Sequence, residues 1–153
     1  LIKTKTKMGR VFFNTRKNIQ TITANHTVLP SDSGSTFIVL PAATTLLTLP
    51  TPTLAGNGWN IKVILQSDSG FGGDGLMDQI VNIGLGDFNT VGHVTAHDTA
   101  AGDQAVDGDD FIACTVDASP GDNFEIMTDG TTWFVQGLVA DTDVATFAAS
   151  AAS

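Results

Sequence analysis

The glycine-rich stretch Gly70-Phe-Gly72-Gly73-Asp74-Gly75 is the first candidate for chemistry, because it matches the G-x-G-x-x-G pattern of dinucleotide-binding loops. Such a loop binds a pyrophosphate where a helix N-terminus follows it, since free backbone N–H groups there hold the phosphate oxygens. Here Asp74 places a negative charge inside the loop, and Gly84 follows too soon for a full helix. We therefore interpret the stretch as a loop between strands, without a nucleotide.

The histidines His93 and His97 are four residues apart, a spacing that on a helix places two metal ligands on one face. The residues between them, Val94-Thr-Ala96, favour a strand instead. Four residues of strand span about 13 Å, which is too far for two bonds of about 2.1 Å to one ion. We expect two surface histidines on a strand.

The nucleophile candidates also lack their partners. The triplet Asp-Ser-Gly of chymotrypsin-like proteases occurs at residues 32–34 and 68–70, but neither copy has the preceding glycine, and both are typical of ordinary turns. Cys114 lies in an apolar run with no cationic neighbour to lower its pKa, so we predict a core residue. As the sole cysteine it also excludes an internal disulfide. We expect no catalytic residue.

Acidic side chains gather in two loops, at Asp103, Asp107, Asp109 and Asp110 and at Asp74 and Asp78. Carboxylates on a flexible loop can bind Ca²⁺ through six to eight oxygens. Neither loop has the EF-hand spacing, so we predict solvated loops and no cofactor, with Ca²⁺ as the alternative. A carboxylate pair for glycoside hydrolysis stays open, although the chain has no Tyr and only one Glu.

Positive and negative charges are distributed very unevenly along the chain. All but one of its 7 Lys and Arg residues lie in residues 1–17, and none of its 16 acidic residues precedes Asp32. From residue 18 onward Lys62 stands against all 16 acidic residues, a formal net charge of −15. A cationic arm, residues 1–17, therefore precedes an anionic body. No apolar run is long enough for a membrane span or for the core of a signal peptide.

The body is predicted to be all-β, an antiparallel β-sandwich or barrel of jelly-roll type with the arm extended. Short β-branched and aromatic runs alternate with turns such as Gly56-Asn-Gly58 and Asp129-Gly130. The predicted strands are 19–24, 36–40, 46–49, 60–66, 79–83, 92–96, 111–117, 123–127 and 132–138. Leu76, Ile80 and Ile83 leave one short helix open. We assign residues 18–139 to the body and 140–153 to an Ala/Ser-rich tail, either a short helix or extended.

The arm combines charged and apolar binding groups. Lys3, Lys5 and Lys7 alternate with threonines, so an extended arm presents all three ammonium groups on one side. The predicted partner-binding residues are Lys3, Lys5, Lys7, Arg10, Val11, Phe12, Phe13, Arg16 and Lys17. Nucleic acid is not expected, because the anionic body would repel it. We expect an acidic protein surface, on a neighbouring copy or on a different shell protein; a disordered solubilising tail is the alternative.

Four segments resemble a small β-module of tailed-bacteriophage virion proteins. They are residues 21–39 with the turn Pro30-Ser-Asp-Ser-Gly34, Leu46-Leu-Thr-Leu-Pro50, Gly56-Asn-Gly-Trp-Asn-Ile-Lys-Val-Ile64 and Asp129-Gly-Thr-Thr-Trp-Phe-Val-Gln-Gly137. The resemblance implies a structural protein: a capsid decoration (cement) protein, expected as a homotrimer on the outer surface of the virion, bound to the major capsid protein. A tail or fibre β-domain that meets a host surface is the alternative, followed by a secreted adhesin or carbohydrate-binding module.

Overall fold

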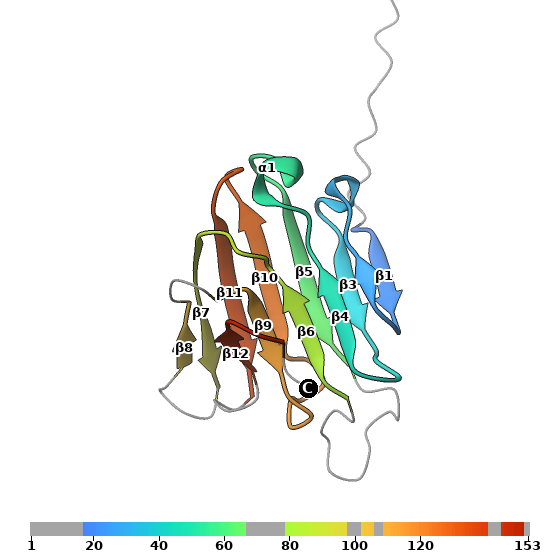
Figure 1. The fold of residues 1–153 in the computed structure, drawn as a ribbon. Coiled ribbons are helices and arrows are strands. Elements are labelled where there is room, and N and C mark those ends of the chain that lie inside the picture. The colour runs from blue at the N-terminus through green and yellow to red at the C-terminus, as the bar shows by residue number, and fades with distance from the viewer. Residues whose placement is uncertain (1–16, 67–78, 98–101, 106–108, 141–144, 152–153) are drawn as a thin grey trace, which may run out of the picture.

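The computed structural model describes residues 17–66, 79–97, 102–105, 109–140 and 145–151 (Figure 1). In this part of the chain two β-sheets pack face to face around a hydrophobic core, which confirms the predicted all-β sandwich. The strands are β1 (Ile19–Ile22), β2 (His26–Thr27), β3 (Thr36–Val39), β4 (Thr45–Thr48), β5 (Asn60–Leu65), β6 (Val81–Gly84), β7 (Thr90–Ala96), β8 (Gly102–Gln104), β9 (Phe111–Cys114), β10 (Asn123–Thr128), β11 (Trp133–Val139) and β12 (Ala145–Ala148). A 3₁₀ turn, η1 (Pro30–Asp32), and a short helix, α1 (Pro52–Ala55), accompany them.

The two sheets differ in size. The larger has seven strands in the order β1-β3-β5-β10-β11-β7-β8, and the smaller has five in the order β12-β9-β6-β4-β2. Along β5, β10 and β11 buried and accessible side chains alternate, as expected for strands that cover a core with one face only. The larger sheet therefore presents its second face to solvent.

The sheets are mixed, so the predicted antiparallel, jelly-roll arrangement is wrong. Half of the pairings between the described strands are parallel: β1 with β3, β3 with β5, β2 with β4, β4 with β6, and β7 with β11. Antiparallel sheets form where consecutive strands pair through short turns. Here the chain crosses to the other sheet after most strands, and the next strand of the same sheet then runs in the same direction.

From β1 to β6 the chain is wound as a flattened coil of three turns. Each turn contributes one strand to the larger sheet and one to the smaller, and each turn stacks in parallel on the one before it. The register places Ile22 beside Val39 and Val39 beside Leu65, and all three side chains are buried. As in solenoid proteins, stacking of successive turns produces a continuous core.

The hairpin between β10 and β11 confirms the predicted turn at Asp129-Gly130. The two strands pair antiparallel, and Gly130 has a φ of +98°, a value that glycine adopts without steric cost. Asp129 Oδ1 accepts hydrogen bonds from the backbone N–H groups of Thr132 and Thr131, both at 2.9 Å. Together with the Thr131 hydroxyl, these donors hold the pKa of Asp129 below its usual range.

Two buried tryptophans lie in the core of the sandwich, and one of them, Trp133, links the two sheets. The rings of Trp59 and Trp133 meet edge to face, with centroids 5.5 Å apart. Trp133 Nε1, on β11 of the larger sheet, donates to the carbonyl of Leu85 just after β6 of the smaller sheet at 3.0 Å. Trp59 Nε1 donates to the carbonyl of Pro30 at 3.1 Å. Both indole N–H groups are thus satisfied inside the core.

All nine predicted strands are present, several of them shorter or shifted by a few residues. The short helix left open at Leu76, Ile80 and Ile83 is wrong for the described residues, because Ile83 lies in β6. Every residue of β6 is buried, so the strand carries no in-out alternation to distinguish it from a helix. Leu76 lies outside the described residues.

The C-terminal segment contributes a strand to the smaller sheet. β12 pairs antiparallel with β9, and Ala145 and Phe147 face the core. The helix alternative for this segment is wrong at residues 145–148, and the sandwich includes these residues, beyond the boundary predicted at residue 139. Alanine has a low preference for strands, so pairing with β9, rather than local propensity, determines the structure here.

Candidate functional site

The solvent-facing side of the larger sheet is the candidate site, and we call it the outer face. It consists of the outward side chains of β5, β10, β11 and β7. On β10, Phe124 and Ile126 are buried while Glu125 and Met127 point outward. On β11, Phe134 and Leu138 are exposed between buried neighbours. The strand period of two therefore separates a core side from a solvent side within each of these strands.

The register of three strands aligns an apolar row across this face. Met127 lies opposite Phe134, and Phe134 lies opposite Val91. Their exposed fractions are 49%, 38% and 54%. At about 4.8 Å between strands the row is about 10 Å long. A shallow hollow of about 300 Å³ opens over the row and is also lined by His93, Glu125 and Gln136. The row gathers three large apolar side chains at one place on the exposed face, which makes it the candidate surface for a partner.

A polar row lies beside the apolar one, two residues further along the strands. Lys62 Nζ and Glu125 Oε1 form an ion pair at 3.1 Å, and Gln136 and His93 continue the row across β11 and β7. The side chains of Lys62 and Glu125 are 31% and 54% exposed. Because exposed ion pairs contribute only about 0–1 kcal/mol to stability, the main effect of these groups is to place charge next to the apolar row.

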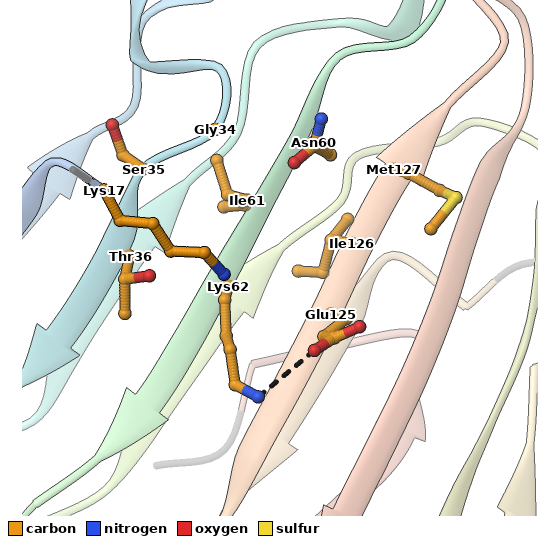
Figure 2. A pocket seen from close by; sticks show the side chains of 10 residues that line it. All are labelled: Lys17, Gly34, Ser35, Thr36, Asn60, Ile61, Lys62, Glu125, Ile126 and Met127. Carbon is orange, nitrogen blue, oxygen red and sulfur yellow. Dashed lines mark hydrogen bonds and ion pairs between the residues drawn. The ribbon is translucent and has the colours of Figure 1, made fainter. Parts of the chain in front are cut away.

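Lys17 is the one predicted arm residue within the described part of the chain, and it lies against the outer face. Figure 2 shows its side chain extending over the sheet toward Lys62. The two lysines, together with Glu125 and Met127, line a hollow of about 270 Å³. Lys17 and Lys62 are also the only Lys or Arg among the described residues. The structure therefore brings the end of the arm to the sheet that carries the apolar row.

The start of β1 anchors the arm to the body. The carbonyl of Asn18 accepts a hydrogen bond from the backbone N–H of Thr36 at 2.8 Å, and the Asn18 side chain donates to Ser35 Oγ at 3.3 Å. These bonds begin the parallel pairing of β1 with β3 at an edge of the larger sheet. The other predicted arm residues, Lys3, Lys5, Lys7, Arg10, Val11, Phe12, Phe13 and Arg16, lie outside the described residues.

The structure tests some of the candidate metal, nucleophile and nucleotide motifs of the sequence. His93 lies in β7 and His97 follows its end, which confirms an extended segment and two exposed histidines. Cys114 is fully buried in β9, and burial raises the pKa of its thiol, which confirms a core residue. The glycine-rich stretch 70–75 and the second Asp-Ser-Gly triplet lie outside the described residues.

Several aspartates accept backbone hydrogen bonds that hold turns or strands in place. Asp32 accepts from the N–H of Leu29 at 2.8 Å, and Gly34 has a φ of +81°, which confirms a turn at the first Asp-Ser-Gly triplet. Asp103 accepts from the N–H of Phe147 at 2.8 Å and so ties β8 to β12. Among the described residues no group of three or more His, Cys, Asp or Glu side chains is placed to hold a metal ion. Asp74, Asp78 and Asp107 lie outside them.

Asp122 is a buried carboxylate that the sequence pattern did not single out. It is 5% exposed and accepts hydrogen bonds from the N–H of Ser119 at 3.0 Å and of Ala140 at 2.9 Å. Burial raises the pKa of Asp122, and the two hydrogen bonds oppose that rise. The side chain joins the loop before β10 to the end of β11. Pro120 and Gly121 before it are typical only of a turn, and nothing in the neighbouring sequence indicates the partner at residue 140.

Substituting Asp122 with asparagine is expected to lower the free energy of unfolding by about 1–3 kcal/mol at acidic pH, because the single amide oxygen leaves one buried N–H group unpaired. A raised folded-state pKa stabilises the protein below the unfolded-state value of about 3.9, and this stabilisation is lost as pH rises through the folded-state value. Urea unfolding of both proteins at pH 4 and pH 7 should therefore show a smaller difference at pH 7. A difference that grows with pH would contradict the assignment.

Within the described residues no helix is long and apolar enough to cross a membrane. Comparison of the chain with models of protein families, with curated proteins and with solved structures finds no match.

Proposed function

We propose that this chain is a structural virion protein, a capsid decoration (cement) protein that binds the major capsid protein of a tailed phage through its N-terminal arm and lies on the outer surface of the shell as a homotrimer. One observation carries the proposal most strongly. The cationic arm ends at Lys17, on the edge of a sheet whose exposed face bears an apolar row and an exposed carboxylate. The proposed binding segment therefore ends at the sheet that carries the proposed binding surface.

The charge distribution supports a chain that attaches through its arm while its body stays exposed to solvent. The arm holds all but one of the positively charged Lys and Arg side chains, and the body carries a formal charge of −15. At physiological salt the attraction between the arm and an anionic body and the repulsion between two anionic bodies both act over about 8 Å. A short flexible arm increases the affinity between neighbours through effective concentration, without a large rigid interface. The arm can then hold subunits together while the bodies face solvent.

Removal of residues 1–17 is expected to abolish attachment to capsids and leave a folded β-domain. The cut keeps Asn18, whose carbonyl begins the pairing of β1 with β3. Cosedimentation with purified capsids measures attachment, and tryptophan fluorescence of the buried Trp59 and Trp133 reports folding.

Two results decide the proposal. Electron microscopy of particles carrying the full chain should show many copies over the head, whereas density confined to the tail would favour the fibre alternative. Full attachment by the folded, shortened chain would overturn the role of the arm.

A matched control keeps all arm charges and changes Val11, Phe12 and Phe13 to serine, which separates electrostatic from apolar binding. We expect that control to bind more weakly and with a steeper loss in salt, because only screened interactions remain.

A further inference from the structure

We propose that the outer face of one copy binds the arm of a second copy, with Val11-Phe12-Phe13 packed on the apolar row of Met127, Phe134 and Val91. This inference rests on the proposed function, which assigns the arm to binding, and it names the surface that the arm binds. The occupant is a second copy of this chain.

The apolar fit follows from strand geometry. An extended segment places Val11 and Phe13 on one side, about 7 Å apart, which lies within the length of about 10 Å of the apolar row. Met127 is flexible and polarisable and packs well against an aromatic ring. Phe134 and Val91 stand beside it in register and expose large parts of their side chains. The apolar triplet of the arm therefore matches the row in chemistry and in length.

The charge of the surroundings also suits the arm. Glu125 lies two residues from Met127 on the same side of β10, about 7 Å away, and its side chain is 54% exposed. Lys62 neutralises part of this carboxylate at 3.1 Å, so the attraction depends on the whole anionic body as well as on Glu125. Arg10 and Arg16 flank the apolar triplet in the sequence and can lie at the two ends of the row.

Reach favours a second copy over the chain's own arm. Lys17 leads into β1, and β7 is five strands further across the sheet, about 24 Å at the usual strand spacing. Four fully extended residues from Lys17 to Phe13 span at most about 14 Å, and six residues to Val11 at most about 22 Å. By backbone length the chain's own arm reaches Met127 on β10, three strands from β1, but stops short of Val91, so it cannot cover the whole row. The arm of a second copy can start from any point beside the sheet, so its length does not prevent it from covering the row. If each copy gives its arm to the next copy in a closed ring, every outer face is occupied.

Engineered cysteines test the exchange in the full-length protein. Phe13→Cys in one preparation is mixed with Phe134→Cys in another, and oxidation is expected to give disulfide-linked dimers in severalfold higher yield than the control mixture. The control is Phe13→Cys with Leu138→Cys, because Leu138 is 50% exposed on the same strand and face but about 14 Å from Phe134. The native Cys114 is buried, so the wild-type chain should give little background.

The outcomes separate this inference from the proposed function. Equal yields of disulfide-linked dimers with Phe134→Cys and with Leu138→Cys would overturn the inference. So would a double variant, Phe13→Cys with Phe134→Cys in one chain, whose disulfides form only within that chain. Serine at both Met127 and Phe134 should lower the sedimenting mass toward that of a monomer, whereas Leu138→Ser should not. Capsid attachment is measured on the same samples. Wild-type chain that exchanges arms but never binds capsids would contradict the proposed function alone.

Discussion

Replacing Trp133 with alanine is expected to lower the free energy of unfolding by about 3–5 kcal/mol, the range for large aromatic truncations in well-packed cores. Its side chain is fully buried and lies edge to face with Trp59 at 5.5 Å. Its Nε1 also satisfies the carbonyl of Leu85 from the opposite sheet. The substitution removes apolar area, an aromatic pair and a hydrogen bond between the two layers, and it leaves a cavity that neighbouring β-strands cannot easily close.

Urea unfolding followed by circular dichroism measures this effect, because the signal does not depend on the lost indole. Trp133→Phe should fall between wild type and Trp133→Ala, since it keeps most of the ring and loses the bond to Leu85. Leu138→Ala on the same strand serves as the surface control and should change the free energy by less than about 1 kcal/mol. A loss from Trp133→Ala no larger than that of the control would show that this side chain does not join the sheets.

Substituting Gly92 with alanine is expected to cost about 3 kcal/mol, at the upper end of the range for overpacked cores. A Cβ at this position would collide with the carbonyl oxygen of Val135 and would lie 2.9 Å from its Cβ. Val135 is the register partner of Gly92 in the parallel pairing of β7 with β11. Both groups belong to backbone held in one sheet, so relief requires the two strands to separate.

Gly84→Ala is the matched control for this prediction. Gly84 is likewise a strand glycine, buried where Gly92 is half-buried, but a Cβ there would meet its nearest atoms at 3.6 Å, an ordinary van der Waals contact. Its stability should therefore stay unchanged or rise by about 0.4–1 kcal/mol, because alanine restricts the unfolded chain. Thermal unfolding of the two variants side by side checks the contrast. Equal destabilisation by both would refute the steric explanation and indicate a general loss of strand flexibility.

Local patterns predicted most of the strands but little of their pairing. The in-out alternation of β5 and the Asp129-Gly130 turn depend on neighbouring residues, and the structure confirms both. The parallel stacking of Ile22, Val39 and Leu65 depends on turns of unequal length, so no repeat period marks it in the sequence. β12 shows the same limit, because its alanines form a strand only beside β9.

The candidate site was predictable to a similar degree. The hairpin alone places Met127 opposite Phe134, so two of the three residues of the apolar row could have been found from the turn and the alternation. Val91 could not, because β7 pairs in parallel with β11 across a long separation in the chain. Asp122 and Asp103 likewise accept hydrogen bonds from residues far along the sequence.

The sequence by itself determined an anionic all-β body preceded by a cationic arm, because charge and strand alternation are properties of consecutive residues. The tertiary structure alone decided how the first six strands wind between two sheets and which side chains share the outer face. Those features depend on which distant strands lie side by side, and pairing is selected by burial of the whole core rather than by any local segment. Lys17 shows both contributions. Its place at the end of the cationic arm is a property of the sequence, whereas its contact with the outer face exists only in the folded sheet.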